Sequence, residues 1–272
     1  MTERPIVLDQ EPAGASRPTQ TARPLIMPDD RLPSLALSRE ALDEQRIVGF
    51  NSRDRRSRAY HLLRAQIGKI MARNNWRMIG ITSATPDAGK TFTSINIAAA
   101  LAATAETNVV LCDFDLRRGS IWRTLGSPTE SGLGDYLDGK VDDPRDLAFR
   151  VNDSRLVVVP TIASDAPSTE LIASERFRSF IAQIRAMPQD TLVICDLPPV
   201  FADDDAIMCM QYLDAFLLVV DHGVSTAHQI EEAMRLLEPA PCLGTVLNRY
   251  KGGFADPYGY GYGDRYGMKT YG

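Results

Sequence analysis

The chain has 272 residues, which suits one sizeable domain with tails. Its net charge of −5 argues against a nucleic-acid-binding protein, and we predict no nucleic-acid partner. The four cysteines, Cys112, Cys195, Cys209 and Cys242, have no CxxC spacing, and we expect thiols in a reducing cytoplasm. Because we find neither a secretory signal nor an apolar run long enough to cross a bilayer, we predict a cytoplasmic protein, which would need a partner to take it to a membrane.

The N-terminal region is rich in proline and polar residues. Residues 1–33 contain six prolines and cannot build a core, so we expect a flexible arm over residues 1–50, with a short helix over residues 34–46 that Ser38 caps. Residues 58–73 form a better helix, because Tyr60, Leu63, Ile67 and Ile70 fall on one face. We therefore predict a folded domain over residues 51–251.

From residue 77 onward, apolar strands alternate with helices. Predicted strands cover residues 78–82, 109–112, 156–159, 192–195, 215–220 and 245–247, and predicted helices cover residues 90–103, 170–187, 204–212 and 226–237. Continuous apolar strands are typical of a parallel sheet buried on both faces. The alternation predicts an α/β fold: a doubly wound, mainly parallel sheet flanked by helices, as in P-loop NTPases, with its ligand at the carboxyl ends of the strands.

The first predicted strand leads directly into a loop of small residues. This loop, Ala84-Thr85-Pro86-Asp87-Ala88-Gly89-Lys90-Thr91, ends in the Gly-Lys-Thr of a P-loop, although its first position is Ala84 rather than glycine. Backbone N–H groups of such a loop bind phosphates, the lysine reaches the β- and γ-phosphates, and the threonine hydroxyl coordinates Mg²⁺. We predict an ATP- and Mg²⁺-binding loop formed by Pro86, Asp87, Ala88, Gly89, Lys90, Thr91 and Phe92.

Polar residues follow three further strands. Asp113 and Asp115 end the second strand, and Asp196, followed by two prolines, ends the fourth in the layout of a Walker B motif. Beside a P-loop, one carboxylate of the first pair can accept a proton and the other can hold Mg²⁺. Asn248 ends the last strand, where it could hydrogen-bond a purine, although a turn-forming asparagine is nearly as good an interpretation.

Residues 252–272 have a different character from the rest of the chain. Glycine and tyrosine alternate there with almost no aliphatic residue, so this segment cannot pack a core and we expect a mobile tail. Its tyrosines are Tyr258, Tyr260, Tyr262, Tyr266 and Tyr271. Glycine spacing leaves each ring accessible to another protein.

Taken as an ordered set, these motifs resemble the bacterial tyrosine kinases (BY-kinases) of capsule and exopolysaccharide synthesis, in particular the CpsD/CapB-like kinase chains that lack their own transmembrane activator. The P-loop, the segment from Asp113 to Arg118, the Asp-Leu-Pro-Pro after the fourth strand and the tyrosine-rich tail carry this resemblance, which runs from about Arg58 to the C-terminus.

The resemblance implies an ATP-dependent protein-tyrosine autokinase that regulates polysaccharide polymerisation and export. It implies Lys90, Asp113, Asp115 and Asp196 as catalytic residues, with Asp113 as general base, and Thr91, Asp115 and Asp196 as metal ligands. The tail tyrosines would be phosphorylated in trans within a ring or dimer. The implied partners are a transmembrane polysaccharide co-polymerase of the Wzz type, which acts as activator, and a tyrosine phosphatase.

Two features of the sequence depart from the family pattern, one in the P-loop and one in the helix that precedes it. Asp87 stands where the family usually has glycine, and Arg58, His61 and Arg64 stand where its oligomer helix has Glu-x-x-Arg-x-x-Arg. Two alternatives therefore remain open. One is a MinD/ParA-type ATPase, although its signature lysine would replace Thr85; the other is a catalytically weak, nucleotide-sensing adaptor of a co-polymerase.

Overall fold

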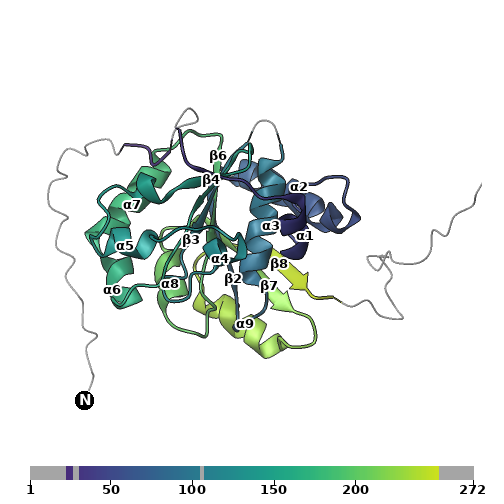
Figure 1. Ribbon diagram of the computed structural model, residues 1–272. Coiled ribbons are helices and arrows are strands. Elements are labelled where there is room, and N and C mark those ends of the chain that lie inside the picture. Colours follow the sequence, from purple (N-terminus) through teal and green to yellow (C-terminus); the bar gives the residue numbers. More distant parts are fainter. Residues whose placement is uncertain (1–22, 27–30, 105–106, 251–272) are drawn as a thin grey trace, which may run out of the picture.

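The computed structural model describes residues 23–26, 31–104 and 107–250. Its centre is a sheet of eight strands in the order β1-β4-β5-β3-β6-β2-β7-β8, with helices on both faces (Figure 1). All neighbouring strands are parallel except β4 and β5. The strands are β1 (Ser34–Leu35), β2 (Met78–Ser83), β3 (Asn108–Asp113), β4 (Phe149–Val151), β5 (Leu156–Val159), β6 (Thr191–Asp196), β7 (Ala215–Asp221) and β8 (Cys242–Asn248). The predicted α/β class and mainly parallel sheet are confirmed.

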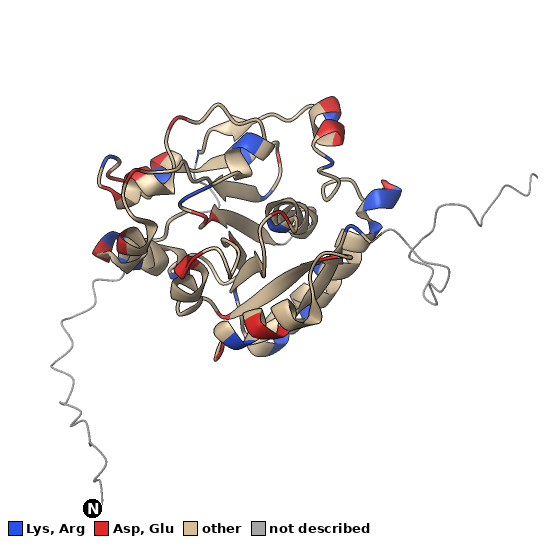
Figure 2. Cartoon of the chain, turned by 90° about the horizontal axis from the view of Figure 1, so that it is seen from below, with Lys and Arg blue, Asp and Glu red and all other residues tan. Residues whose placement is uncertain are grey.

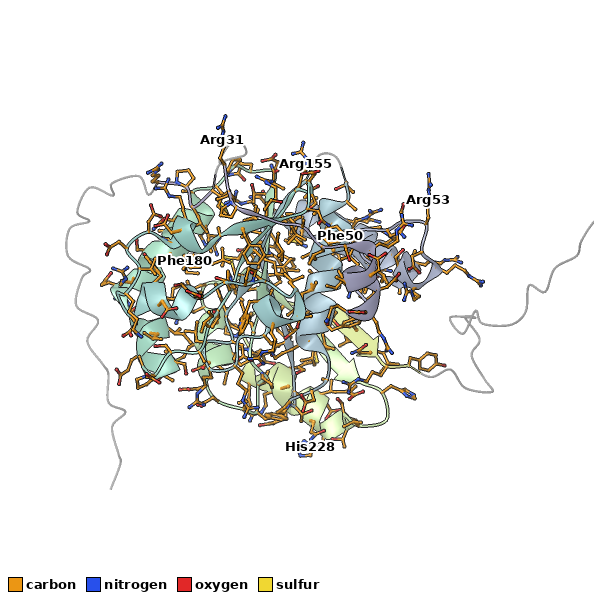
Figure 3. All side chains as sticks on the ribbon, in the orientation of Figure 1. Arg31, Phe50, Arg53, Arg155, Phe180 and His228 are labelled. Atoms are coloured by element: carbon orange, nitrogen blue, oxygen red, sulfur yellow. The ribbon has the colours of Figure 1, made fainter. Side chains whose placement is uncertain are left out.

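Each face of the sheet has its own apolar core. One face is covered by α1 (Arg39–Glu44), α2 (Arg58–Asn74), α3 (Lys90–Ala102) and α4 (Ile121–Thr124). The other is covered by α5 (Leu133–Leu137), α6 (Ser168–Ala173), α7 (Glu175–Arg185), α8 (Asp205–Met210) and α9 (Ala227–Leu236). On this second face Phe180 of α7 lies inside the molecule (Figure 3) and packs against Phe114, with ring centroids 6.3 Å apart. The strands between the two layers read as unbroken apolar runs for this reason.

The helix predicted over residues 170–187 is two helices. Ser174 leaves the helical conformation, because its φ of −71° and ψ of 157° are those of an extended residue, so α6 ends there. Its hydroxyl oxygen accepts a hydrogen bond from the backbone N–H of Phe177 and thereby caps α7. The apolar periodicity continues across the break, but a serine that caps the second helix interrupts the backbone.

The N-terminal region is more ordered than its composition predicts. The expectation of a flexible arm over residues 1–50 is wrong for the described residues, because Leu25 is fully buried and Ile47 and Val48 are 4% exposed. β1 pairs with β4, and Ser38 caps α1 as predicted. Apolar residues scattered among polar ones find a place on an existing core that they could not build alone. Residues 1–22 lie outside the described residues, as does the tail at 252–272.

No helix in the part of the chain that the structure describes is both long enough and apolar enough to cross a membrane. The helices α3 and α7 instead pack against opposite faces of the sheet.

Candidate active site

The P-loop lies at the carboxyl end of β2, in the middle of the sheet. It runs from Ala84 into α3, and Gly89 precedes the helix with a φ of 88°. A Cβ atom on Gly89 would lie 2.1 Å from Nδ2 of Asn248, so a side chain at this position would collide with the end of β8. Glycine is therefore required both by the backbone conformation and by the neighbouring strand.

Three carboxylates converge on one ammonium group at the floor of the site. Nζ of Lys90 lies 3.0 Å from Oδ2 of Asp115 and 3.7 Å from Oδ2 of Asp196. Burial alone would lower the pKa of Lys90, but the charges of Asp196, Asp115 and Asp113 raise it above its ordinary value. Lys90 therefore stays protonated, and the cluster keeps an excess of negative charge when all three carboxylates are ionised.

Asp196 anchors the start of α3 to the end of β6. Its Oδ2 accepts a 2.6 Å hydrogen bond from Oγ1 of Thr91, and its Oδ1 accepts one of 2.9 Å from Oγ of Ser94. Burial raises the pKa of the Asp196 carboxyl, whereas Lys90 opposes that shift. Ser94 has no place among the predicted residues; its position one helical turn after Lys90 was the available signal.

Asp113 lies behind the site rather than in it. Its side chain is fully buried, and its oxygens accept hydrogen bonds from the backbone N–H groups of Asp115, Ser120 and Ile121. Burial and then the charge of Asp196 raise the pKa of Asp113 well above its usual range. The general-base role predicted for Asp113 stays a prediction. In this structure Asp113 holds the loop after β3 in place, whereas Asp115 faces the cleft.

The loop after β3 is also tied to the end of β5. Oγ1 of Thr161 donates a 2.6 Å hydrogen bond to the carbonyl oxygen of Asp113, and a Cβ on Gly119 would lie 2.4 Å from the carbonyl oxygen of Thr161. Sequence reasoning missed Thr161 and Gly119, because their importance comes from contacts between segments far apart in the chain. Thr161, for example, bonds to a residue 48 positions earlier. The close approach fixes the path of the segment that carries Asp115.

Asn248 contacts the P-loop itself. Its Nδ2 donates a 2.8 Å hydrogen bond to the carbonyl oxygen of Ala88, and its Oδ1 accepts one of 2.9 Å from the backbone N–H of Arg249. In this structure the amide therefore holds the loop and the end of β8 together. The predicted contact with a purine stays a prediction.

An open cleft of about 770 Å³ lies over these strand ends. Lys90, Thr91 and Asp115 line its floor, while Arg118, Trp122 and Arg123 line it beyond the end of β3. Its size falls in the range of sites that hold a small molecule such as a nucleotide. Pro86, Gly89 and Phe92 also face the cleft, as expected for phosphate-binding residues; Ala88 is buried beneath it.

Asp87 forms the outer lip of the P-loop. It is exposed, lines the cleft and has a φ of 61°, which non-glycine residues rarely adopt. Aspartate tolerates this conformation better than most residues, which explains how it can replace the glycine usual in the family. Its carboxylate remains beside the place where phosphates would lie.

The oxygen atoms at the floor suit a magnesium ion. Thr91, Asp115 and Asp196 bring a hydroxyl and two carboxylates together around Lys90. Within the described ranges, no group of three or more His, Cys, Asp or Glu side chains could hold a metal ion by itself. This fits Mg²⁺, which proteins usually bind through one or two carboxylates together with water and substrate phosphates.

The helix α2 matches the oligomer helix of the family, and one of its basic residues, Arg64, bonds within the chain. Nη1 of Arg64 donates a 3.2 Å hydrogen bond to the carbonyl oxygen of Ala100 in α3. Both ring nitrogens of His61 are buried without a hydrogen-bond partner among the described residues, and burial lowers the pKa of this histidine. Arg64 therefore joins α2 to the P-loop helix.

Lysine and arginine alternate with aspartate and glutamate over the helices (Figure 2). An extended basic face of the kind that binds nucleic acid is not visible among the described residues in this view.

Comparisons with known proteins identify the family of this chain. No family model matches the chain. The tyrosine-protein kinase Etk of Escherichia coli K12 is 32% identical over 200 residues, which cover 73% of this chain and 27% of that protein. The tyrosine-protein kinase Wzc of Salmonella typhimurium is 31% identical over 196 residues, which cover 70% of this chain and 26% of that protein. The chain thus spans about a quarter of the length of these relatives.

Solved structures give the same result. The kinase domain of the E. coli tyrosine kinase ETK has a TM-score of 0.66 and 28% identity, and the match covers 85% of this chain and 94% of that one. The septum site-determining protein MinD of Pyrococcus horikoshii, solved with Mg-ADP, has a TM-score of 0.53 at 22% identity, covering 64% of this chain and 71% of that one, and so shares the fold. The sequence relatives and the ETK domain together place this chain in the bacterial tyrosine-kinase (BY-kinase) family.

Proposed function

We propose that this protein is an ATP-dependent tyrosine autokinase that phosphorylates the tyrosine cluster of its C-terminal tail in trans. The observation that carries the proposal is the buried cluster of Lys90 with Asp115 and Asp196 at the mouth of a P-loop. In-line phosphoryl transfer depends mainly on positioning and on stabilisation of charge, and this cluster supplies both.

The phosphates of ATP would lie along the loop from Pro86 to Thr91. Loop N–H groups and the start of α3 would bind them, with Lys90 at the β- and γ-phosphates. A Mg²⁺ ion would be held by Thr91, Asp115 and Asp196, and would neutralise charge on the transferred phosphoryl group. The same oxygens now bond to Lys90 and to each other, so nucleotide binding would rearrange these contacts.

The acceptor would be a tyrosine hydroxyl from Tyr258, Tyr260, Tyr262, Tyr266 or Tyr271, which lie outside the described residues. We assign Asp115 as the carboxylate that receives or orients its proton, because Asp115 lines the cleft. Asp113 would act through the backbone N–H groups that it binds. A candidate base must lie within hydrogen-bond reach of the proton that it takes.

Regulation of exopolysaccharide or capsule polymerisation and export is part of the same proposal. A transmembrane co-polymerase of the Wzz type would recruit the protein from the cytoplasm to the inner membrane and activate it. A tyrosine phosphatase would reverse the modification. Self-association as a ring or dimer would bring one tail to a neighbouring site, although the engaged Arg64 points to contacts other than those usual in the family.

The test is intact-mass measurement on phosphatase-treated chain incubated with Mg-ATP, for the wild type and for Lys90→Met. We expect a ladder of phosphate additions that maps to residues 258–271 in the wild type and none in the variant. Lys69→Met, an exposed change on α2, is the matched control. ATP hydrolysis without tail phosphate, with and without the co-polymerase present, would contradict the kinase and favour the MinD/ParA-type ATPase.

A further inference from the structure

Two arginines at one end of the cleft have no anionic partner. Arg118 and Arg123 both line the cleft and are exposed, and neither forms a salt bridge with any described residue. The guanidinium carbon of Arg123 lies 5.2 Å from the ring centroid of Trp122, which also lines the cleft. A guanidinium beside an aromatic ring is well suited to planar, anionic, aromatic ligands.

The other basic residues of the cleft are neutralised from within the chain. Lys90 pairs with Asp115 and Asp196, Arg117 pairs with Asp203, and Nη1 of Arg249 lies 2.7 Å from Oδ2 of Asp221. Uncompensated positive charge in the cleft is thus confined to Arg118 and Arg123. We use the name "arginine end" for Arg118, Trp122 and Arg123.

The arginine end lies on the acceptor side of the transferred phosphate. Nζ of Lys90 points toward Asp115, so the γ-phosphate end of the site is toward β3. Arg118 and the helix α4, which carries Trp122 and Arg123, follow β3, whereas Arg249 follows β8 on the far side of β2. A nucleotide that extends from the P-loop toward β8 leaves the arginine end for the acceptor.

The unmodified tail has no net side-chain charge to match this end. Residues 252–272 contain two aspartates, Asp256 and Asp264, and two basic residues, Arg265 and Lys269. A phosphate on tyrosine adds a charge of about −1.5 to −2 and three acceptor oxygens. Charge complementarity between tail and cleft therefore arises only after a first phosphorylation.

The spacing of the tyrosines fits two neighbouring subsites. Tyr258, Tyr260 and Tyr262 are two residues apart, so their side chains would project from the same face of an extended chain, roughly 7 Å from one to the next. Asp115 and Arg118 are neighbours in the loop after β3, where the backbone N–H of Arg118 donates a 3.0 Å hydrogen bond to Oδ1 of Asp115. One such step would therefore move a ring from Asp115 toward the arginine end.

We propose that the arginine end is a phosphotyrosine subsite, which binds a tail that already carries one phosphate while the next tyrosine enters the site. This inference rests on the proposed kinase function and deepens it. The first phosphate on a tail would then favour the second, so that modification of the cluster proceeds in runs rather than at random. Nucleotide phosphates are the competing ligand for the same two arginines.

The experiment measures binding of fluorescent peptides of residues 252–272, either unmodified or phosphorylated at Tyr260, to the full, dephosphorylated chain with Mg-ADP. We expect the phosphopeptide to bind at least 10-fold more tightly than the unmodified peptide. In Arg118→Gln/Arg123→Gln this preference should fall below 2-fold with unchanged Mg-ADP affinity. The control, Arg53→Gln/Arg73→Gln, removes the same charge from two exposed arginines. Arg53 points away from the molecule (Figure 3). This control should keep the preference for the phosphopeptide.

Each other outcome overturns the inference. These outcomes are equal binding of the two peptides by the wild type, a preference that survives in Arg118→Gln/Arg123→Gln, an equal loss in the control, and a parallel loss of Mg-ADP affinity. The last would assign the arginines to the nucleotide. Because this assay needs no phosphoryl transfer, its result is independent of the intact-mass test: a chain that phosphorylates its tail without preferring the phosphopeptide would refute the subsite alone.

Discussion

The floor and the arginine end of the cleft use charge in opposite ways. At the floor, Lys90, Asp115 and Asp196 are almost fully buried and bond to one another. At the arginine end, Arg118 and Arg123 are exposed and have no anion within the described chain. A buried charge is stable only with its partners, whereas an exposed charge remains available to a ligand. Changes at the floor should therefore disturb the catalytic cluster, whereas changes at the exposed edge should affect binding alone.

The largest expected effect is at Lys90. Lys90→Met removes the ammonium that pairs with Asp115 and Asp196 and the group proposed to bind the β- and γ-phosphates, so we expect tail phosphorylation to fall at least ~10³-fold. Rates from intact mass measure this, with Lys69→Met unchanged. A Lys90→Met protein that retained more than a tenth of the wild-type rate would show that the floor is not the catalytic centre.

Asp113 and Asp115 should separate into a structural and a catalytic carboxylate. We expect Asp115→Asn to lower kcat by ~10²-fold or more with little change in stability. Asp113→Asn should lower the free energy of unfolding by about 1–3 kcal/mol, because an amide cannot accept all three backbone hydrogen bonds. Urea unfolding and phosphorylation rates compare the two. A stable Asp113→Asn protein without activity would restore Asp113 as the general base.

The same pair gives a pH dependence. The folded-state pKa of Asp113 is raised, so the folded chain takes up this proton at a higher pH than the unfolded chain does. Lowering the pH therefore stabilises the wild type by an amount that Asp113→Asn cannot gain. As the pH is lowered from 7.5 to 5.5, the stability difference between the two proteins should move toward the wild type. Urea midpoints that move in parallel would show that Asp113 does not titrate in this range.

Asn248 gives a smaller effect, on the side of the cleft away from the arginine end. Asn248→Ala removes the hydrogen bond to Ala88 and loosens the P-loop, so we expect the affinities for Mg-ATP, Mg-GTP and Mg-CTP all to fall about 3- to 10-fold. Titration calorimetry with the three nucleotides tests this. A loss confined to purine nucleotides would instead establish the predicted contact with the base.

The smallest expected effect is at Asp87. Asp87→Asn keeps a residue that tolerates the φ of 61° but removes the charge beside the phosphates, so we expect ATP to bind about 3-fold more tightly. Asp87→Gly, measured in parallel, also removes the backbone strain. Weaker binding by both variants would mean that the carboxylate assists the metal ion.

The sequence predicted the repeating core of this fold well and its breaks poorly. Six predicted runs became β2, β3, β5, β6, β7 and β8. The first five are buried on both faces and need no polar alternation, whereas β8 is a partly exposed edge strand. The two-residue β1 pairs with β4, and the three-residue β4 pairs with β1 and β5. No local sequence pattern predicts either short strand. The break at Ser174 depends on a single cap inside an apolar pattern that continues without change.

Within the site, the P-loop and the strand-end aspartates could be predicted because their function fixes their place in the chain. The different positions of Asp113 and Asp115 could not. Two residues apart on a strand they would project on the same side, but the chain leaves the strand after Asp113, and the backbone of Ser120 and Ile121 closes over it. That loop encloses the carboxylate of Asp113 and leaves the carboxylate of Asp115 lining the cleft. The loop also contacts Thr161.

The N-terminal segment has a practical consequence for where the domain begins. Oδ1 of Asn96 accepts hydrogen bonds from the backbone N–H groups of Val48 and Gly49, and a Cβ on Gly49 would lie 2.3 Å from the carbonyl oxygen of Asn96. A protein shortened to start at residue 51, the boundary that composition suggests, would leave Oδ1 of Asn96 without these two donors in the middle of α3, less than two turns from Lys90. Its loss of activity would be easily mistaken for the loss of a regulatory segment, so truncation series should begin upstream of Leu25.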